Sequence, residues 1–235
     1  MSLGALAKTH FDLDLSAQQV TAFETYAALL VEWNQRMNLT SITEPDAIRV
    51  KHFLDSLSIF HIPDLPERLR FIDVGTGAGL PGIALKIVRP AWRGVLIDST
   101  GKKVDFLNHV IEALGLDGIR AEQLRAEEAG QRKDLRERFD LVMARAVARM
   151  PVLAEYLLPL CRVSGLCIAM KGDTAQTETD DATKAIQMLG GEVENLIPVM
   201  LPEVEQTHYL VCIRKIAPTP KTYPRRVGVP AKNPL

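Results

Sequence analysis

The stretch FIDVGTGAGLPG, residues Phe71 to Gly82, decides the fold, and its glycines can be interpreted in two ways. Counted from Gly77, they have the G-x-G-x-x-G spacing of a dinucleotide-binding loop. Counted from Gly75, they have the G-x-G-x-G spacing of loops that bind S-adenosylmethionine. The alternating apolar segment before the loop runs directly into Gly75, so we place the start of the turn there. Gly82 then falls in the following helix and lets it pack close to the sheet.

Two acidic residues flank this turn. Asp73 precedes the first glycine, and its carboxylate would repel a pyrophosphate but attract a sulfonium or an α-ammonium group. Asp98 ends the next apolar segment, GVLID, where a carboxylate can accept hydrogen bonds from both ribose hydroxyls of a nucleoside. Asp98 therefore predicts a cofactor with a nucleoside, which both S-adenosylmethionine and a dinucleotide contain. Asp73 favours S-adenosylmethionine over a dinucleotide.

The order of segments after Leu69 predicts the fold class. Short apolar runs alternate with amphipathic stretches, which is the βαβα pattern of a parallel, doubly wound sheet. After Gly172 the order changes to a polar helix and then to two successive strands joined by the short PEVEQ. These two strands predict an antiparallel hairpin at the end of the sheet. We therefore expect a Rossmann-like methyltransferase fold of the α/β class, with a seven-stranded sheet and an antiparallel last strand.

Three regions follow from the same pattern. Residues 1–66 are expected to form an N-terminal helical extension, with one helix capped by Ser16 and running to about Leu39, and another starting at Thr43. Residues 67–216 are expected to form the methyltransferase domain. Residues 217–235 form a basic tail, whose five prolines predict that it can neither join a sheet nor continue a helix.

Composition and charge limit the class of protein further. A hydrophobic fraction of 47% over 235 residues excludes a disordered chain. There is no apolar run of the roughly 18 residues that a membrane helix needs, and no signal-peptide pattern, so we expect a soluble, cytoplasmic protein without a membrane partner. The three cysteines lie in apolar runs and the histidines lack metal-ligand spacing, which predicts core thiols and no metal site. The net charge of −1 hides a C-terminal segment with six basic and no acidic residues.

Several motifs in one order carry a family resemblance. They are FIDVGTGAGLPG, LIDSTGKKVDFL, LRAEEAG, FDLVMARAVA and IAMKG, together with the N-terminal YAALLVEWNQRMNLTSI and VKHFLDSL and the tail TPKTYPRRVGVPAKNPL. In these motifs the chain resembles the bacterial ribosomal RNA small-subunit methyltransferase G family (RsmG, formerly glucose-inhibited division protein B). The resemblance implies an enzyme that transfers a methyl group from S-adenosylmethionine to N7 of a guanine in the 530 loop of 16S rRNA.

The resemblance, with the turn and Asp98 described above, also gives the expected cofactor contacts. The residues are Gly75, Gly77, Leu80, Asp98, Ala126, Glu127 and Arg145. Ala126 and Glu127 match the pair that borders the adenine, and Arg145 matches an arginine beside the cofactor. Arg145 is also a candidate for orienting the methionine carboxylate or the guanine O6.

The expected chemistry needs no catalytic base, because the N7 lone pair of guanine is available without removal of a proton. The sequence agrees, since the fourth strand ends in MARAVA and not in the motif used to methylate exocyclic amines. Two alternatives stay open. One is an NAD(P)-dependent oxidoreductase, which the loop counted from Gly77 would allow, and the other is a non-catalytic RNA-binding protein of the same fold.

Basic residues of the tail are the expected RNA contacts. Phosphates attract clustered cations, and an aromatic ring among them can stack on a base. The residues are Lys221, Arg225, Arg226 and Lys232, with Tyr223 between them. The expected partner is 16S rRNA, within the small ribosomal subunit, and nothing in the sequence indicates an obligate protein partner. Whether Arg49, Lys51 and His52 line the same face is left open.

Overall fold

The computed structural model describes residues 1–235, and its centre is one seven-stranded sheet. The strands lie in the order β3-β2-β1-β4-β5-β7-β6, in which β1 to β5 are parallel and β7 runs antiparallel to both of its neighbours. This confirms the predicted doubly wound sheet with its antiparallel last strand. The strands are β1 Arg70–Val74, β2 Arg93–Asp98, β3 Ile119–Gln123, β4 Phe139–Arg145, β5 Cys161–Lys171, β6 Gly191–Val199 and β7 His208–Lys215.

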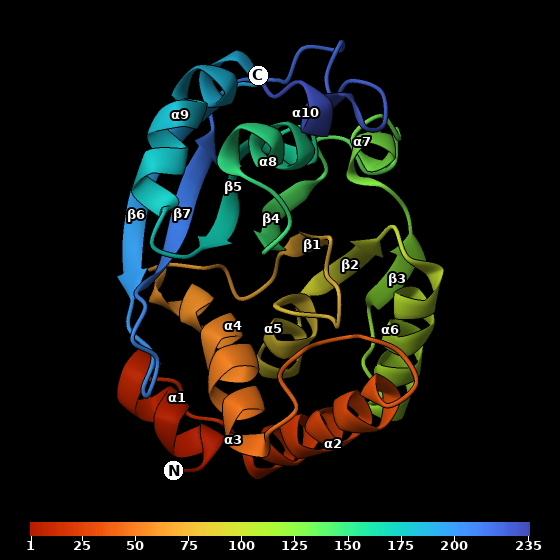
Figure 1. Ribbon diagram of the computed structural model, residues 1–235, viewed down its shortest axis with the longest axis vertical. Coiled ribbons are helices and arrows are strands. Elements are labelled where there is room, and N and C mark those ends of the chain that lie inside the picture. The colour runs from red at the N-terminus through yellow and green to blue at the C-terminus, as the bar shows by residue number, and fades with distance from the viewer.

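Helices cover both faces of the sheet (Figure 1). The helices before β1 are α1 Leu3–Phe11, α2 Ala17–Asn34, α3 Pro45–Ile48, η1 Arg49–Leu54, α4 Asp55–Leu57 and η2 Ser58–His61. The later ones are α5 Gly82–Val88, α6 Gly101–Ala113, α7 Ala126–Ala129, α8 Met150–Leu157, α9 Ala175–Met188 and α10 Val229–Lys232. None of them combines the length and apolar character needed to cross a membrane.

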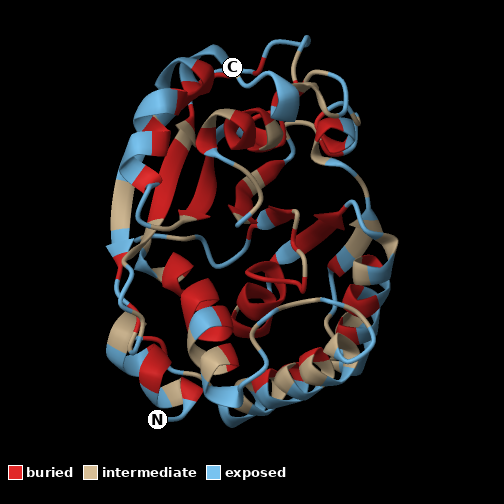
Figure 2. Ribbon diagram, in the orientation of Figure 1, coloured by how far each residue is buried: buried red, intermediate tan, exposed pale blue.

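Two apolar cores lie on the two faces of the sheet, and Figure 2 shows the buried strands between the helical layers. The first core joins the N-terminal helices to α5, α6 and the sheet, through residues such as Phe23 of α2, Phe53 of η1 and Phe71 of β1. The second core joins α7, α8 and α9 to the other face, and Tyr223 of the tail packs against it. The N-terminal helices therefore share a core with the sheet.

Local chemistry explains where the N-terminal helices begin and end. Ser16 caps α2 as predicted, in a capping box with Gln19. The helix ends at Asn34, earlier than predicted, because the Asn34 side chain accepts hydrogen bonds from the amides of Leu39 and Thr40 and so turns the chain. The next helix has Pro45 as its first residue.

The tail adds no strand to the sheet and contains one short helix. This helix, α10, has Pro230 in its first turn, where a missing amide hydrogen costs nothing. Other tail residues contact α7, α8 and the end of α9 (Figure 1). The segment after β7 is therefore packed on the body of the protein.

Candidate functional site

The glycine turn lies at the carboxyl end of β1, where the strand order reverses between β1 and β4. Ligands of doubly wound sheets bind at this edge and at this reversal. Gly75, Gly77 and Gly79 have φ values of +65°, +60° and +92°, a conformation that side chains with a Cβ rarely adopt. A Cβ at Gly79 would lie 2.5 Å from Cδ1 of Ile83, whereas a Cβ at Gly77 would face open space. Gly77 is therefore where a ligand can approach the backbone.

Asp73 lies beneath this turn and is fully buried. Its Oδ2 accepts hydrogen bonds from Oγ1 of Thr76 at 2.7 Å and from the amide of Gly82 at 2.9 Å. Its Oδ1 has no hydrogen-bond partner, and it is the one buried side-chain nitrogen or oxygen in the protein with none. Burial raises the pKa of the Asp73 carboxyl to about 6, so the group is still mainly ionised at neutral pH.

Gly82 has the packing role predicted for it. A Cβ there would lie 2.4 Å from Cδ2 of Leu96 and 2.9 Å from Oδ2 of Asp73. Only a residue without a side chain lets α5 start this close to β2 and to the buried carboxylate. Gly82 therefore serves the close packing of α5 against β1 and β2.

Asp98 lies behind the turn at the end of β2. Its Oδ2 accepts a hydrogen bond from the amide of Gly77 at 3.1 Å, and its Oδ1 accepts one from the amide of Thr100 at 2.9 Å. Nζ of Lys103 is 3.6 Å from Oδ2. The structure thus brings Asp98 and Gly77, two residues predicted to contact the same cofactor, together at one edge of the sheet.

The other predicted cofactor residues follow neighbouring strands. Leu80 is buried in the turn that leads into α5, and Ala126 and Glu127 open α7 after β3. The Glu127 carboxylate points to the tail, since its Oε1 accepts hydrogen bonds from the amide of Gly228 at 2.9 Å and from the hydroxyl of Tyr156 at 3.4 Å. Oε2 of Glu127 has no hydrogen-bond partner in the protein, so this oxygen, the main chain and the methylene groups are all open to a ligand.

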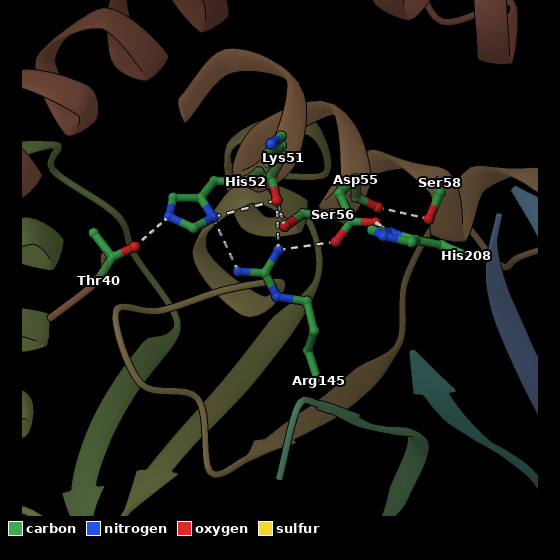
Figure 3. Close-up of polar contacts among 8 residues, drawn as sticks. All are labelled: Thr40, Lys51, His52, Asp55, Ser56, Ser58, Arg145 and His208. Carbon is green, nitrogen blue, oxygen red and sulfur yellow. Dashed lines mark hydrogen bonds and ion pairs between the residues drawn. The ribbon is translucent and has the colours of Figure 1, made fainter. Parts of the chain in front are cut away.

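Arg145 ends β4 and extends toward the N-terminal helices, as Figure 3 shows. Its Nη1 donates to Oδ2 of Asp55 at 2.9 Å and to the carbonyl oxygen of Lys51 at 3.2 Å. Its Nη2 lies 3.4 Å from Nδ1 of His52. The other carboxylate oxygen of Asp55 is 2.8 Å from Nδ1 of His208, at the start of β7.

The pKa values of the two histidines of this network are shifted in opposite directions. Burial and the nearby Arg145 guanidinium lower the pKa of His52 to about 4, so its ring is neutral at pH 7, and its Nε2 is 2.8 Å from Oγ1 of Thr40. The hydrogen bond to Asp55 raises the pKa of His208 above its ordinary value. Sequence reasoning gave no role to His208 or Asp55, although Asp55 lies within the quoted VKHFLDSL.

A cavity of about 550 Å³ opens beside Arg145 at the carboxyl ends of β4 and β5. Its polar lining includes Arg145, Asp55, Lys171, Glu178 and His208. Nζ of Lys171 donates to Oε2 of Glu178 at 2.6 Å, so the acids of this lining are already paired with cations. A hollow of similar size around Arg93 lies at the amino ends of the strands, away from the glycine turn.

The tail contradicts one predicted RNA contact. The Arg225 guanidinium donates from Nη2 to Oε2 of Glu155 at 2.7 Å and from Nε to Oε1 at 3.0 Å, and Glu155 is fully buried. Arg225 is therefore an internal anchor of the tail. Lys221, Arg226 and Lys232 are exposed and form no ion pair. Tyr223 packs on the second core.

Arg49, Lys51 and His52, the three further candidates for RNA contact, differ in their surroundings. His52 is buried in the network around Arg145. Arg49 forms an ion pair with Asp46 at 2.5 Å. Lys51 is exposed and lines the cavity. Of these three residues, only Lys51 presents a free cation at the mouth of the site.

Comparisons with known proteins agree with this geometry. A family model described as rRNA small subunit methyltransferase G (GidB) matches residues 19–207. A ribosomal RNA small subunit methyltransferase G from Desulforamulus reducens is 45% identical over 229 residues, covering 97% of this chain and 95% of the relative. One from Lactobacillus johnsonii is 46% identical over 232 residues, covering 98% and 96%.

Solved structures share the fold at low sequence identity. A variant of the 16S rRNA (adenine(1408)-N(1))-methyltransferase from Catenulisporales acidiphilia has a TM-score of 0.53 and 18% identity, covering 64% of this chain and 86% of that one. A precorrin-6y C5,15-methyltransferase from Geobacter metallireducens has a TM-score of 0.51 and 15% identity, covering 76% and 91%. These similarities concern the fold alone.

Proposed function

The chain belongs to the rRNA small subunit methyltransferase G family, and on that premise we propose that it methylates N7 of a guanine in the 530 loop of 16S rRNA. The methyl donor is S-adenosylmethionine. The proposal includes recognition of the RNA within a small ribosomal subunit and action in the cytoplasm, where such subunits are made. It also treats residues 1–66 as the extension, 67–216 as the methyltransferase domain and 217–235 as the tail.

The structural observation that supports S-adenosylmethionine as the cofactor is the unpartnered Oδ1 of Asp73 beneath the glycine turn. A buried polar atom without a partner is costly unless a ligand completes it. A carboxylate suits the cationic methionine end of S-adenosylmethionine and would repel the pyrophosphate of a dinucleotide. The buried Asp73 carboxylate therefore fits S-adenosylmethionine and weighs against an NAD(P)-dependent oxidoreductase.

The remaining cofactor residues receive roles that match their positions. Gly75, Gly77 and Leu80 would contact the cofactor along the turn, and Asp98 would accept the ribose hydroxyls. Ala126 and Glu127 would border the adenine at the start of α7. Arg145 would lie between the cofactor and the cavity at the ends of β4 and β5.

Bound S-adenosylmethionine supplies an electrophilic methyl group, and the residues of the chain have to align the acceptor with it. The carboxylates that line the cavity are held by cationic side chains. Asp55 is paired with Arg145 and His208, Glu178 is paired with Lys171, and both ring nitrogens of His52 have polar neighbours. This lining suits methylation of N7, which requires no proton removal. Guanine presents O6 and N7 as acceptors on one edge, and the Arg145 guanidinium is a suitable donor to O6.

The test is methyl transfer to purified ribosomal components. We would incubate the protein with labelled S-adenosylmethionine and with small subunits from cells that lack the modification, and map the labelled nucleotide. Deproteinised 16S rRNA in a parallel incubation distinguishes free RNA from an assembled subunit as the substrate. Label at N7 of a guanine in the 530 loop is the expected result, and cofactor binding without label would indicate a non-catalytic RNA-binding protein.

Calorimetry tests separately whether Asp73 contributes to the binding of S-adenosylmethionine. Asp73→Asn keeps the shape of the side chain and removes its charge, so we expect the affinity for S-adenosylmethionine to fall by about tenfold or more. Asp117→Asn is the matched control, because Asp117 is exposed at the opposite edge of the sheet. Binding of NADH in place of S-adenosylmethionine would refute the proposal.

A further inference from the structure

Asp55 joins three parts of the chain that are remote in sequence. It opens α4 in the N-terminal region, and its two carboxylate oxygens contact Arg145 at the end of β4 and His208 at the start of β7 (Figure 3). Only 5% of the Asp55 side chain is exposed. The carboxylate is therefore removed from solvent and bound by a different partner on each oxygen.

These contacts fix an otherwise flexible side chain. A free arginine loses rotamer entropy when its position is fixed. Here one guanidinium nitrogen of Arg145 is held by both Asp55 and the carbonyl oxygen of Lys51, and the other approaches His52. All three of these groups lie on η1 and α4, so the N-terminal helices determine where the Arg145 charge lies.

The position of that charge is relevant to the reaction. Arg145 lines the cavity at the carboxyl ends of β4 and β5, and its charge also acts on the buried carboxylate of Asp73 beneath the glycine turn. The guanidinium thus lies between the proposed cofactor site and the space for the acceptor base. A displacement of about 1 Å at such a place can cost a hundredfold in rate.

We propose that Asp55 is a positioning residue that holds Arg145 in its working orientation, with His208 fixing the second oxygen of the carboxylate. The proposal rests on the methyl transfer proposed above. It makes the N-terminal helices a part of the reaction centre, beyond any contact that they make with RNA. Asp55 acts only through Arg145, so losing either residue should damage the same step.

A double-mutant cycle tests this relation. Asp55→Asn keeps the size of the side chain and removes its charge, and Arg145→Gln removes the group that Asp55 holds. We would measure kcat and KM for methyl transfer to unmodified small subunits, and the dissociation constant of S-adenosylmethionine, for both single variants and the double variant. Asp46→Asn is the matched control, because Asp46 is an exposed aspartate of the same region that pairs with Arg49.

We expect Asp55→Asn to lower kcat/KM by about 10- to 100-fold and to change the same kinetic parameter, kcat or KM, as Arg145→Gln does. In the double variant, Asp55→Asn should lower kcat/KM by less than about twofold beyond the loss caused by Arg145→Gln alone. Asp46→Asn should retain the wild-type rate. His208→Gln, which leaves the pair of Asp55 and Arg145 in place, should give a smaller loss of about 3- to 10-fold. It provides a second measurement if Asp55→Asn folds poorly.

Two results would overturn the proposal while the wild type is active. One is a wild-type rate for Asp55→Asn measured well below its melting temperature. The other is a multiplicative loss in the double variant, which would show that the two residues act independently. An inactive wild type would instead refute the proposed function and this inference with it.

Discussion

Replacing Arg225 by alanine should destabilise the protein strongly, although the residue lies in a basic tail close to the C-terminus. The Glu155 carboxylate has no exposed surface, and Arg225 supplies it with hydrogen bonds from Nε, from Nη2 and from its own amide. Truncation of the side chain leaves that buried carboxylate without a charged partner, which costs about 3–5 kcal/mol in comparable pairs. One quarter of the Arg225 side chain is exposed, so water can reach the gap, and we expect about 3 kcal/mol, the lower end of that range.

In a chain of this length, that loss corresponds to a fall in Tm of roughly 6–12 °C. Thermal unfolding followed by circular dichroism at neutral pH measures it. Arg226→Ala is the matched control, because Arg226 is exposed and makes no ion pair, so its replacement should change stability by less than about 0.5 kcal/mol. Equal Tm values for the two variants would refute the assignment of Arg225 as an internal anchor.

Three further outcomes are expected. Gly79→Ala should lower the free energy of unfolding in urea by at least about 2 kcal/mol more than Gly77→Ala, since only the former adds a clash to the left-handed strain; equal losses would contradict the role given to each glycine. The carboxylate of Asp55 raises the pKa of His208, so this contact stabilises the folded protein when His208 is protonated. The stabilisation is complete at pH values below the ordinary His pKa of 6.5 and is lost as the pH rises through the raised pKa. The Tm of the wild type should thus fall more steeply above pH 6.5 than that of His208→Gln, and parallel curves would argue against the contact. Arg226→Ala should reduce the slope of log affinity for RNA against log salt by about 0.7–0.9 and leave cofactor affinity unchanged, whereas an unchanged slope would mean that Arg226 is only solvated.

The fold could be predicted from the sequence because its signals are local. The apolar alternation of FIDV sets the end of β1, the glycines after it require positive φ values, and two consecutive strands after α9 indicate the antiparallel end of the sheet. The end of α2 was placed too late, because it depends on hydrogen bonds from the Asn34 side chain that apolar periodicity does not reveal.

The contacts around the site could not be predicted, because their partners are distant along the chain. Asp55 meets Arg145 across 90 residues and His208 across 153, and no spacing rule connects such positions. The charge pattern of the tail also could not show that Arg225 and Arg226 have different roles. The two are adjacent and chemically identical, and only the fold shows that one of them faces a buried carboxylate 70 residues away.

The place of β7 in the sheet affects how the protein can be made. It lies between β5 and β6 although it is synthesised after both, and β6 pairs with no other strand. A ribosome adds about 5–20 residues per second, so β5 presents an open edge for a time on the order of seconds before β7 arrives. Open strand edges pair readily with other chains. A message that ends before residue 208 therefore yields a chain with an unclosed sheet, which exposes it to aggregation, chaperones and proteases.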